Sequence, residues 1–221
     1  MTSLVLFSQV GFAYARHDVL RDLSLQLDPG EVIVLQGCSG VGKSTLLRLA
    51  AGILRPTSGY VHIGAQRIGV VFQEPRLLPW RTALQNVMLP LLSLGMDPAQ
   101  AGQKATNMLE HMGLAHFLEA VPEELSGGMK QKLALCCALI HRPAVLLLDE
   151  PTTGVDAVSR SEFWDMLSDL KRRGISMLVS TPYMDEARRC DRIALCDRGR
   201  LLGVDTPQGI VRGFGGRLYV L

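Results

Sequence analysis

The sequence has no long apolar run, no cluster of basic residues and no recognisable leader. Because no stretch of about 18 consecutive apolar residues occurs, no segment is expected to span a membrane as a helix. The formal net charge is only +2 over 221 residues, and no basic run offers a nucleic-acid-binding surface. Residues 1–7 lack the basic and long apolar segments of a secretory signal. These absences favour a cytoplasmic protein with no nucleic-acid partner.

Paired cysteines are also missing. The five cysteines are odd in number, Cys136 and Cys137 are adjacent, and none belongs to a C-x-x-C pair. Free thiols in a reducing compartment are therefore expected rather than disulfides. Internal repeats and low-complexity segments are absent as well.

The most informative feature that is present is a phosphate-binding loop of the form G-x-x-x-x-G-K-[ST]. It follows a buried strand expected at residues 31–36 and opens a helix expected at residues 43–51. The glycines let N–H groups turn inward around a phosphate at a helix N-terminus, Lys43 adds positive charge, and the Ser44 hydroxyl suits Mg²⁺. The alternative is a glycine-rich turn that binds nothing. We expect a nucleoside triphosphate at Gly37, Cys38, Ser39, Gly40, Val41, Gly42, Lys43, Ser44 and Thr45.

The order of the remaining elements indicates an α/β protein. Residues 3–14 and 23–27 read as antiparallel strands, residues 60–63 and 68–72 as short strands, and residues 82–120 and 129–140 as helical. A strand at 144–148, a helix at 159–173, a strand at 175–179, a helix at 184–190 and a strand at 192–196 continue the alternation. We predict one domain over residues 1–221. It has a phosphate-loop NTPase core with a mainly parallel sheet, an N-terminal antiparallel β subdomain and an α-helical subdomain inserted at about residues 78–135.

Two acids, Asp149 and Glu150, follow the apolar strand at residues 144–148. Ligands of open α/β sheets gather at the carboxyl ends of the strands. Asp149 is therefore predicted to hold Mg²⁺, together with Ser44, and Glu150 to orient the attacking water or accept its proton. The alternative is a pair of solvated acids in a turn.

The segment Leu125-Ser-Gly-Gly-Met-Lys-Gln131 resembles the signature sequence of ATP-binding cassette (ABC) ATPases, which reads L-S-G-G-Q at this place. The order of phosphate loop, Gln73, signature, acid pair and Asp156 is also similar to that family, over essentially the whole chain. The resemblance implies a head-to-tail dimer that sandwiches two ATP molecules. In it, Ser126, Gly127, Gly128 and Gln131 would serve the γ-phosphate of ATP bound to a second copy. Met129 stands where the family usually has glutamine.

Three further positions acquire roles from the resemblance. Tyr14 matches the aromatic residue that stacks on adenine, with an ordinary strand aromatic as the alternative. Gln73 matches the loop that reaches Mg²⁺ and water and couples to the helical insertion, and it joins Lys43 and Glu150 as a catalytic candidate. Asp156 matches the loop that contacts the opposite subunit. Taken alone, Gln73 and Asp156 would read as polar surface residues.

One position departs from the family pattern. Pro182 occupies the place of the switch histidine, and proline has neither a side-chain donor nor an N–H group. We therefore expect slow hydrolysis, with Glu150 as the remaining catalytic group. The alternative is a heterodimer with another ABC ATPase that carries intact sites.

The resemblance implies separate permease subunits in the membrane, which would hold the chain on the cytoplasmic face. Residues 72–82 and 86–87 look like importer ATPases of the nitrate, sulfonate and taurine class, whereas residues 127–132, 180–187 and 189–192 look like the ABC-2 export branch. Leu77, Leu78 and Trp80 are candidate contacts for the permease, or else members of the helical subdomain core.

Two other functions stay open. One is an ABC ATPase acting on nucleic acid or ribosomes, although such proteins usually carry two cassettes and this chain shows one. The other is a regulatory ATP-binding module that rarely hydrolyses ATP. The apolar, strand-like end at residues 213–221 belongs either to a minimal ATPase subunit or to a longer protein.

Overall fold

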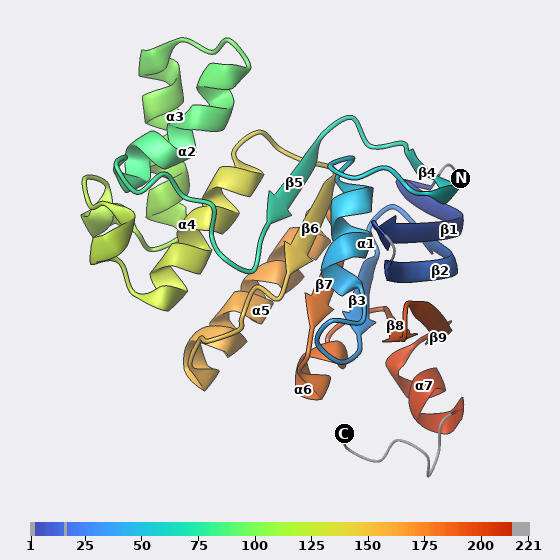
Figure 1. Ribbon diagram of the computed structural model, residues 1–221. Helices are drawn as coiled ribbons and strands as arrows, with labels where there is room; N and C mark the ends of the chain where they lie inside the picture. Colours follow the sequence, from blue (N-terminus) through green and yellow to red (C-terminus); the bar gives the residue numbers. More distant parts are fainter. Residues whose placement is uncertain (1–2, 16, 214–221) are drawn as a thin grey trace.

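The computed structural model describes residues 3–15 and 17–213 (Figure 1). The strands are β1 (Val5–Tyr14), β2 (His17–Leu27), β3 (Val32–Gln36), β4 (Ser58–Ile63), β5 (Ile68–Val71), β6 (Val145–Asp149), β7 (Ser176–Thr181), β8 (Arg192–Asp197) and β9 (Arg200–Asp205). The α-helices are α1 (Lys43–Ala50), α2 (Ala83–Ser93), α3 (Pro98–His111), α4 (Gly127–Leu139), α5 (Ala157–Arg172), α6 (Met184–Ala187) and α7 (Pro207–Gly213). Short 3₁₀ turns lie at Ala115–Phe117 and Pro122–Glu124.

The strands form two sheets. A three-stranded antiparallel sheet has the order β2-β1-β4, and a six-stranded sheet has the order β5-β6-β7-β3-β8-β9. All neighbours in the larger sheet are parallel except β8 and β9, which are antiparallel. This arrangement confirms the predicted α/β class with a mainly parallel sheet and an N-terminal antiparallel sheet.

The central strands of the larger sheet are buried on both faces, as their unbroken apolar runs predict. Alternate residues face opposite layers. Ile33 and Leu147 pack in the cluster that contains α1 and the antiparallel sheet, whereas Val34 and Leu148 pack in the cluster that contains α4 and α5. The carboxyl ends of β3, β6 and β7 therefore emerge between two packed layers, and this rigid edge carries the candidate site.

The helices α2, α3 and α4 form a helical layer at one end of the sheet (Figure 1). Ala101, Ala105 and Leu109 on α3 repeat every four residues and are fully buried against α2 and α4. Helix α4 contacts both sides, since Leu133 packs in the helical layer and Leu135 packs in the cluster beneath the sheet. The helical layer is thus attached to the sheet through α4.

Several element boundaries differ from the sequence prediction. Strand β2 begins at His17, whereas the prediction began at residue 23. The prediction missed the first part of the strand because Asp22 has a positive φ of 50° and interrupts the alternation of apolar residues. Helix α6 ends at Ala187 instead of residue 190. Strand β9 was not predicted, and the expected strand-like end falls mostly on residues 214–221, outside the described part. Between residues 3 and 213, apart from residue 16, no helix is long and apolar enough to cross a membrane.

Candidate nucleotide-binding site

The predicted phosphate loop joins β3 to α1 with the expected strand–loop–helix geometry. Gly40 and Gly42 have φ values of 80° and 108°, a region that residues with a Cβ rarely adopt. At Gly37 a Cβ would collide with the main-chain carbonyl oxygen of Cys196 on β8. The glycine positions of the motif therefore follow from backbone conformation and close packing, which shape a loop that a phosphate can approach.

Lys43 lies at the start of α1 with only 4% of its surface exposed. Its Nζ donates to the carbonyl oxygens of Gly37 at 2.7 Å and Cys38 at 3.0 Å. The same Nζ lies 3.6 Å from Oε1 of Glu150. The ammonium group is thus held over the mouth of the loop, where the β- and γ-phosphates of a nucleotide would meet it.

Asp149, at the end of β6, is the centre of a group of hydroxyls. Its Oδ1 accepts from Ser44 Oγ at 2.9 Å and from Ser180 Oγ at 2.8 Å. Ser44 comes from the phosphate loop and Ser180 from the neighbouring strand β7. A carboxylate and a hydroxyl are hard oxygen donors, which suit Mg²⁺ when phosphate oxygens complete the shell. The donor set fits the predicted metal.

Glu150 follows Asp149 with a positive φ of 45°, an uncommon conformation for a non-glycine residue. Its main-chain N–H donates to Ser180, and its Oε2 accepts from Thr153 Oγ1 at 3.3 Å and lies 3.5 Å from Gln73 Nε2. Together with the Lys43 contact, these bonds bring the three predicted catalytic residues to one edge of the sheet. The carboxylate thus lies beside the Lys43 ammonium group and the Gln73 amide.

The signature residues lie elsewhere. Ser126 caps α4, its Oγ accepting from the main-chain N–H of Met129 at 3.3 Å, and Gly127 and Gly128 form the first turn of that helix. In Figure 1 the start of α4 lies well apart from the phosphate loop. The structure therefore does not bring Ser126, Gly127 and Gly128 to the phosphate loop of their own chain.

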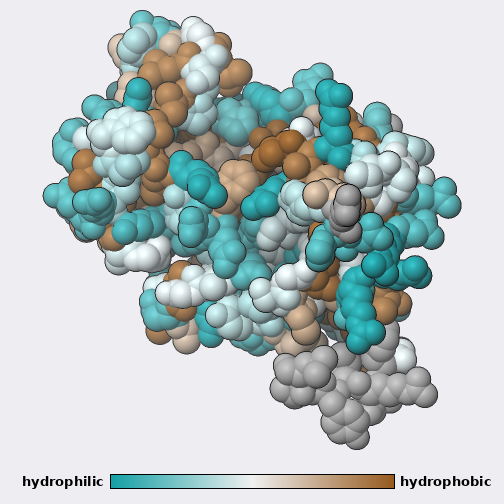
Figure 2. All heavy atoms as spheres, in the orientation of Figure 1, coloured by the Kyte–Doolittle hydropathy of each residue, from teal (hydrophilic) through white to brown (hydrophobic). Residues whose placement is uncertain are grey.

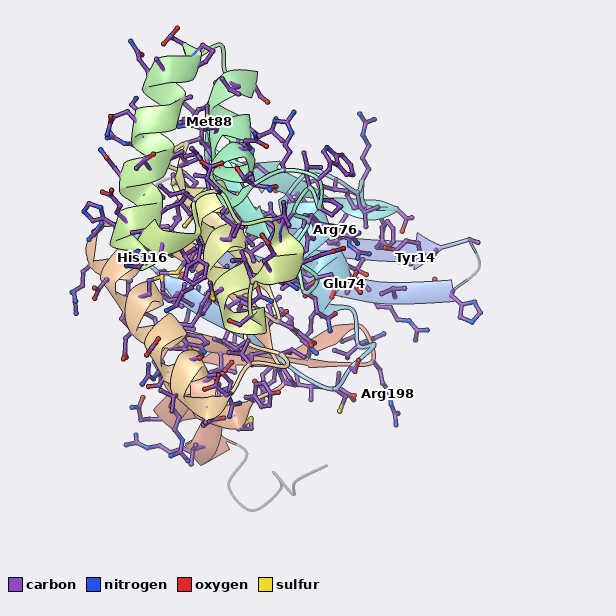
Figure 3. All side chains as sticks on the ribbon, turned by 90° about the vertical axis from the view of Figure 1, so that its left-hand side faces the viewer. Tyr14, Glu74, Arg76, Met88, His116 and Arg198 are labelled. Carbon is purple, nitrogen blue, oxygen red and sulfur yellow. The ribbon has the colours of Figure 1, made fainter. Side chains whose placement is uncertain are left out.

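The other candidates occupy distinct settings. Gln131 is buried, and its Nε2 donates to the main-chain oxygen of Gln73 at 3.4 Å, which links α4 to the Gln73 loop. Asp156 caps α5 and accepts from the N–H groups of Ser159 and Val158; the bond from Ser159 contributes most to lowering the pKa of the carboxyl. Tyr14 ends β1 at the hairpin tip, is 44% exposed and packs edge-to-face on Phe12 (Figure 3).

The cysteines are free, as predicted. Cys38 in the phosphate loop is exposed, whereas burial raises the pKa of the Cys196 thiol to about 11 and that of Cys137 to about 12. Since the thiolate is the reactive form, Cys38 is the thiol most available to reagents at neutral pH.

Several polar residues around the site were not predicted. Glu186 on α6 is buried and accepts from Thr152 Oγ1 at 2.7 Å and from Thr181 Oγ1 at 2.5 Å. Ser180 is also buried, at the register position opposite Asp149. The parallel alignment of β6 with β7 could have indicated Ser180, but no sequence signal joins Thr152 to Glu186.

Comparison with known proteins matches residues 20–153 to the ABC transporter family. The chain is 37% identical to the lipoprotein-releasing system ATP-binding protein LolD of Legionella pneumophila (strain Paris), over 91% of this chain and 96% of that protein. It is 42% identical to the aliphatic sulfonates import ATP-binding protein SsuB 1 of Xanthomonas axonopodis pv. citri, over 87% of this chain and 78% of that protein.

Among solved structures, the chain resembles the dimeric ATP-binding cassette MJ0796 bound to ADP and Pi. The TM-score is 0.85 at 28% identity, and the match covers 92% of this chain and 98% of that one. Together with the phosphate loop, the acid pair and the signature helix, these matches confirm the resemblance seen in the sequence. The chain belongs to the ABC transporter family, as an ATP-binding cassette.

Proposed function

We propose that the chain binds ATP with Mg²⁺ at the β3–α1 loop, hydrolyses it with Glu150 and drives the membrane subunits of a transporter. The observation that carries the proposal is the group of contacts joining Lys43, Gln73 and Glu150 at one sheet edge. The fold brings these side chains together from three separate segments of the chain. Phosphoryl transfer depends on such positioning and on electrostatic stabilisation.

Each residue has a distinct task in this proposal. The loop N–H groups and Lys43 bind the phosphates, while Ser44, Asp149 and Gln73 hold Mg²⁺, which neutralises phosphate charge when bound. Glu150 accepts a proton from the attacking water or orients it. Ser180 fixes both acids, because its hydroxyl donates to Asp149 and accepts from the N–H of Glu150.

The active form in this proposal is a head-to-tail dimer with a second copy or with another ABC ATPase. The signature turn at Ser126 and the loop at Asp156 lie on caps of α4 and α5, with their carboxylate or hydroxyl groups exposed. A helix start offers N–H groups to an anion. The similar cassette MJ0796 is described as dimeric, which supports the same arrangement here.

Membrane subunits are the second partner we propose, with the chain held at the cytoplasmic face. Trp80, in the loop between β5 and α2, is 74% exposed, and Leu94 at the end of α2 is 67% exposed. Figure 2 shows hydrophobic surface along the helical layer and in the hollow beside it. Leu77 packs partly into the core instead. The direction of transport stays open, since one relative is named for import and another for lipoprotein release.

Co-purification tests the proposed partner. A tagged chain extracted with its native membranes in mild detergent should retain a polytopic membrane protein, and Trp80→Ala should lower the retained amount by about tenfold, the effect of losing an aromatic anchor. Tyr60→Ala on β4, also exposed at 57%, serves as the matched control and should retain the partner. Recovery of ribosomal material in place of a membrane protein would contradict the proposal.

We further propose that hydrolysis is slow because Pro182 lacks a side-chain donor. Pro182 follows β7 beside Glu150, and a positioned hydrogen bond at such a site lowers the barrier by on the order of 2–4 kcal/mol. Pro182→His is therefore expected to raise kcat by about 30-fold or more. Steady-state phosphate release from wild type and variant measures this. A fast wild type that Pro182→His does not improve speaks against it.

A further inference from the structure

Three neighbouring strands bring Gln36, Pro182 and Glu150 to the same edge of the sheet. In the strand order β6-β7-β3, Asp149 is level with Ser180 and Gln36 is level with Thr181. Glu150 and Pro182 are the next residues along their strands. The residue that ends the phosphate-loop strand therefore lies beside the segment that starts at Pro182.

Gln36 is a polar exception within its strand. The other residues of β3 are aliphatic and buried, and Gln36 itself is only 7% exposed. Its Nε2 donates to the main-chain oxygen of Pro182 at 3.1 Å. Because a carbonyl only accepts, the amide NH₂ group must face it. A buried amide costs free energy unless it is hydrogen-bonded. Here the NH₂ group makes this bond, whereas Oε1 of the same side chain is buried without a hydrogen-bond partner among the described residues.

The segment beyond Pro182 is tied to two other parts of the site. The guanidinium of Arg160 on α5 lies 4.4 Å from the ring centroid of Tyr183. Thr181 and Thr152 both donate to Glu186, and Thr152 belongs to the turn that follows Glu150. Movement at Pro182 would therefore reach both the start of α5 and the turn that carries Glu150.

We propose that Gln36 is a positioning residue, which transmits occupancy of the phosphate loop to the segment at residues 182–187. Gln36 directly precedes Gly37 at the paired end of β3, so a shift of the loop on phosphate binding would be passed to the Gln36 side chain. The amide then holds Pro182, and through it Tyr183 and the contact with Arg160. The expected effect on kcat rests on the proposed ATP hydrolysis. The contact between Gln36 and Pro182 is independent of that proposal.

Two substitutions separate the donor from the shape of the side chain. Gln36→Met keeps the length without a donor, and Gln36→Glu keeps the shape but, when ionised, turns an acceptor toward the Pro182 carbonyl. Both are expected to lower kcat by about tenfold while ATP affinity, measured by calorimetry, stays within about twofold. Hydrogen exchange in the peptide spanning residues 182–190 should become about tenfold faster in both. Gln100→Met, at an exposed position on α3, is the matched control and should change none of these.

The outcomes distinguish this inference from the proposed function. If wild type hydrolyses ATP and both variants leave kcat and exchange unchanged, the positioning role is wrong. It is also wrong if Gln36→Met behaves as wild type, since the donor would then be dispensable, or if affinity falls in step with kcat. If wild type is no faster than Glu150→Gln, the proposed hydrolysis fails, and hydrogen exchange in the Gln36 variants then decides on the link between Gln36 and Pro182. Faster exchange at residues 182–190 supports this link, and unchanged exchange overturns it.

Discussion

Glu150→Gln is expected to lower ATP hydrolysis by about 100-fold or more, the usual contribution of a positioned general base. The amide has the shape of the carboxylate, so contacts from Thr153 and Gln73 to this side chain can persist. What is lost is the ability to accept a proton from water. Initial rates of phosphate release, measured at saturating ATP and Mg²⁺, give the ratio of kcat values directly.

Binding of ATP should survive the same substitution. Lys43 Nζ lies 3.6 Å from Oε1 of Glu150, so removing the negative charge of Glu150 frees the ammonium group to bind phosphate. It also removes the repulsion between the carboxylate and the phosphates of ATP. The variant should therefore accumulate as an ATP-bound dimer, which light scattering after size exclusion can detect. Glu162→Gln on α5, which changes an exposed partner of Lys132 on α4, is the control and should keep full activity. A Glu150→Gln variant that retains a third of the wild-type rate would show that another group activates the water.

The site residues that the sequence predicted are close together in the chain, so that local secondary structure fixes their relative positions. Gly42, Lys43 and Ser44 are consecutive, so a strand followed by a helix fixes their relation to one another. Asp149 and Glu150 were predicted because ligands gather at the carboxyl end of an apolar parallel strand. The meeting of the loop with the acids follows from the sheet order, in which β6 and β3 flank β7.

The residues that the sequence did not predict depend on contacts between distant segments. Gln36 and Pro182 are 146 positions apart, and Thr152 and Glu186 are 34 apart. Gln36 would read as the polar end of a strand and Glu186 as a solvated helix acid. Their bonds become visible only once β3, β7 and α6 are packed together. The late start predicted for β2 has a local cause, because the bulge at Asp22 breaks the period of two on which strand prediction relies.

Lys43→Met is expected to weaken ATP binding by about 100-fold, because hydrogen bonds to charged groups contribute about 1.5–3 kcal/mol each and Lys43 would make such bonds to the phosphates. Methionine has a similar length, so the packing of this buried position is largely kept. Lys104→Met at an exposed position on α3 is the matched control and should bind ATP as wild type does.

Cys38 provides a readout of this loss within the loop itself. It is the exposed cysteine, while burial raises the pKa of Cys196, Cys190 and Cys137 to about 11 or 12 and so suppresses their thiolates at neutral pH. ATP with Mg²⁺ should protect Cys38 from alkylation in wild type and in Lys104→Met. In Lys43→Met, protection should require about 100-fold more nucleotide, in step with calorimetry. Equal protection in all three proteins would mean that Lys43 contributes little to nucleotide binding. If ATP protected Cys38 in none of the three proteins, the β3–α1 loop would owe its glycines to packing, such as that of Gly37 on β8, and not to a bound phosphate.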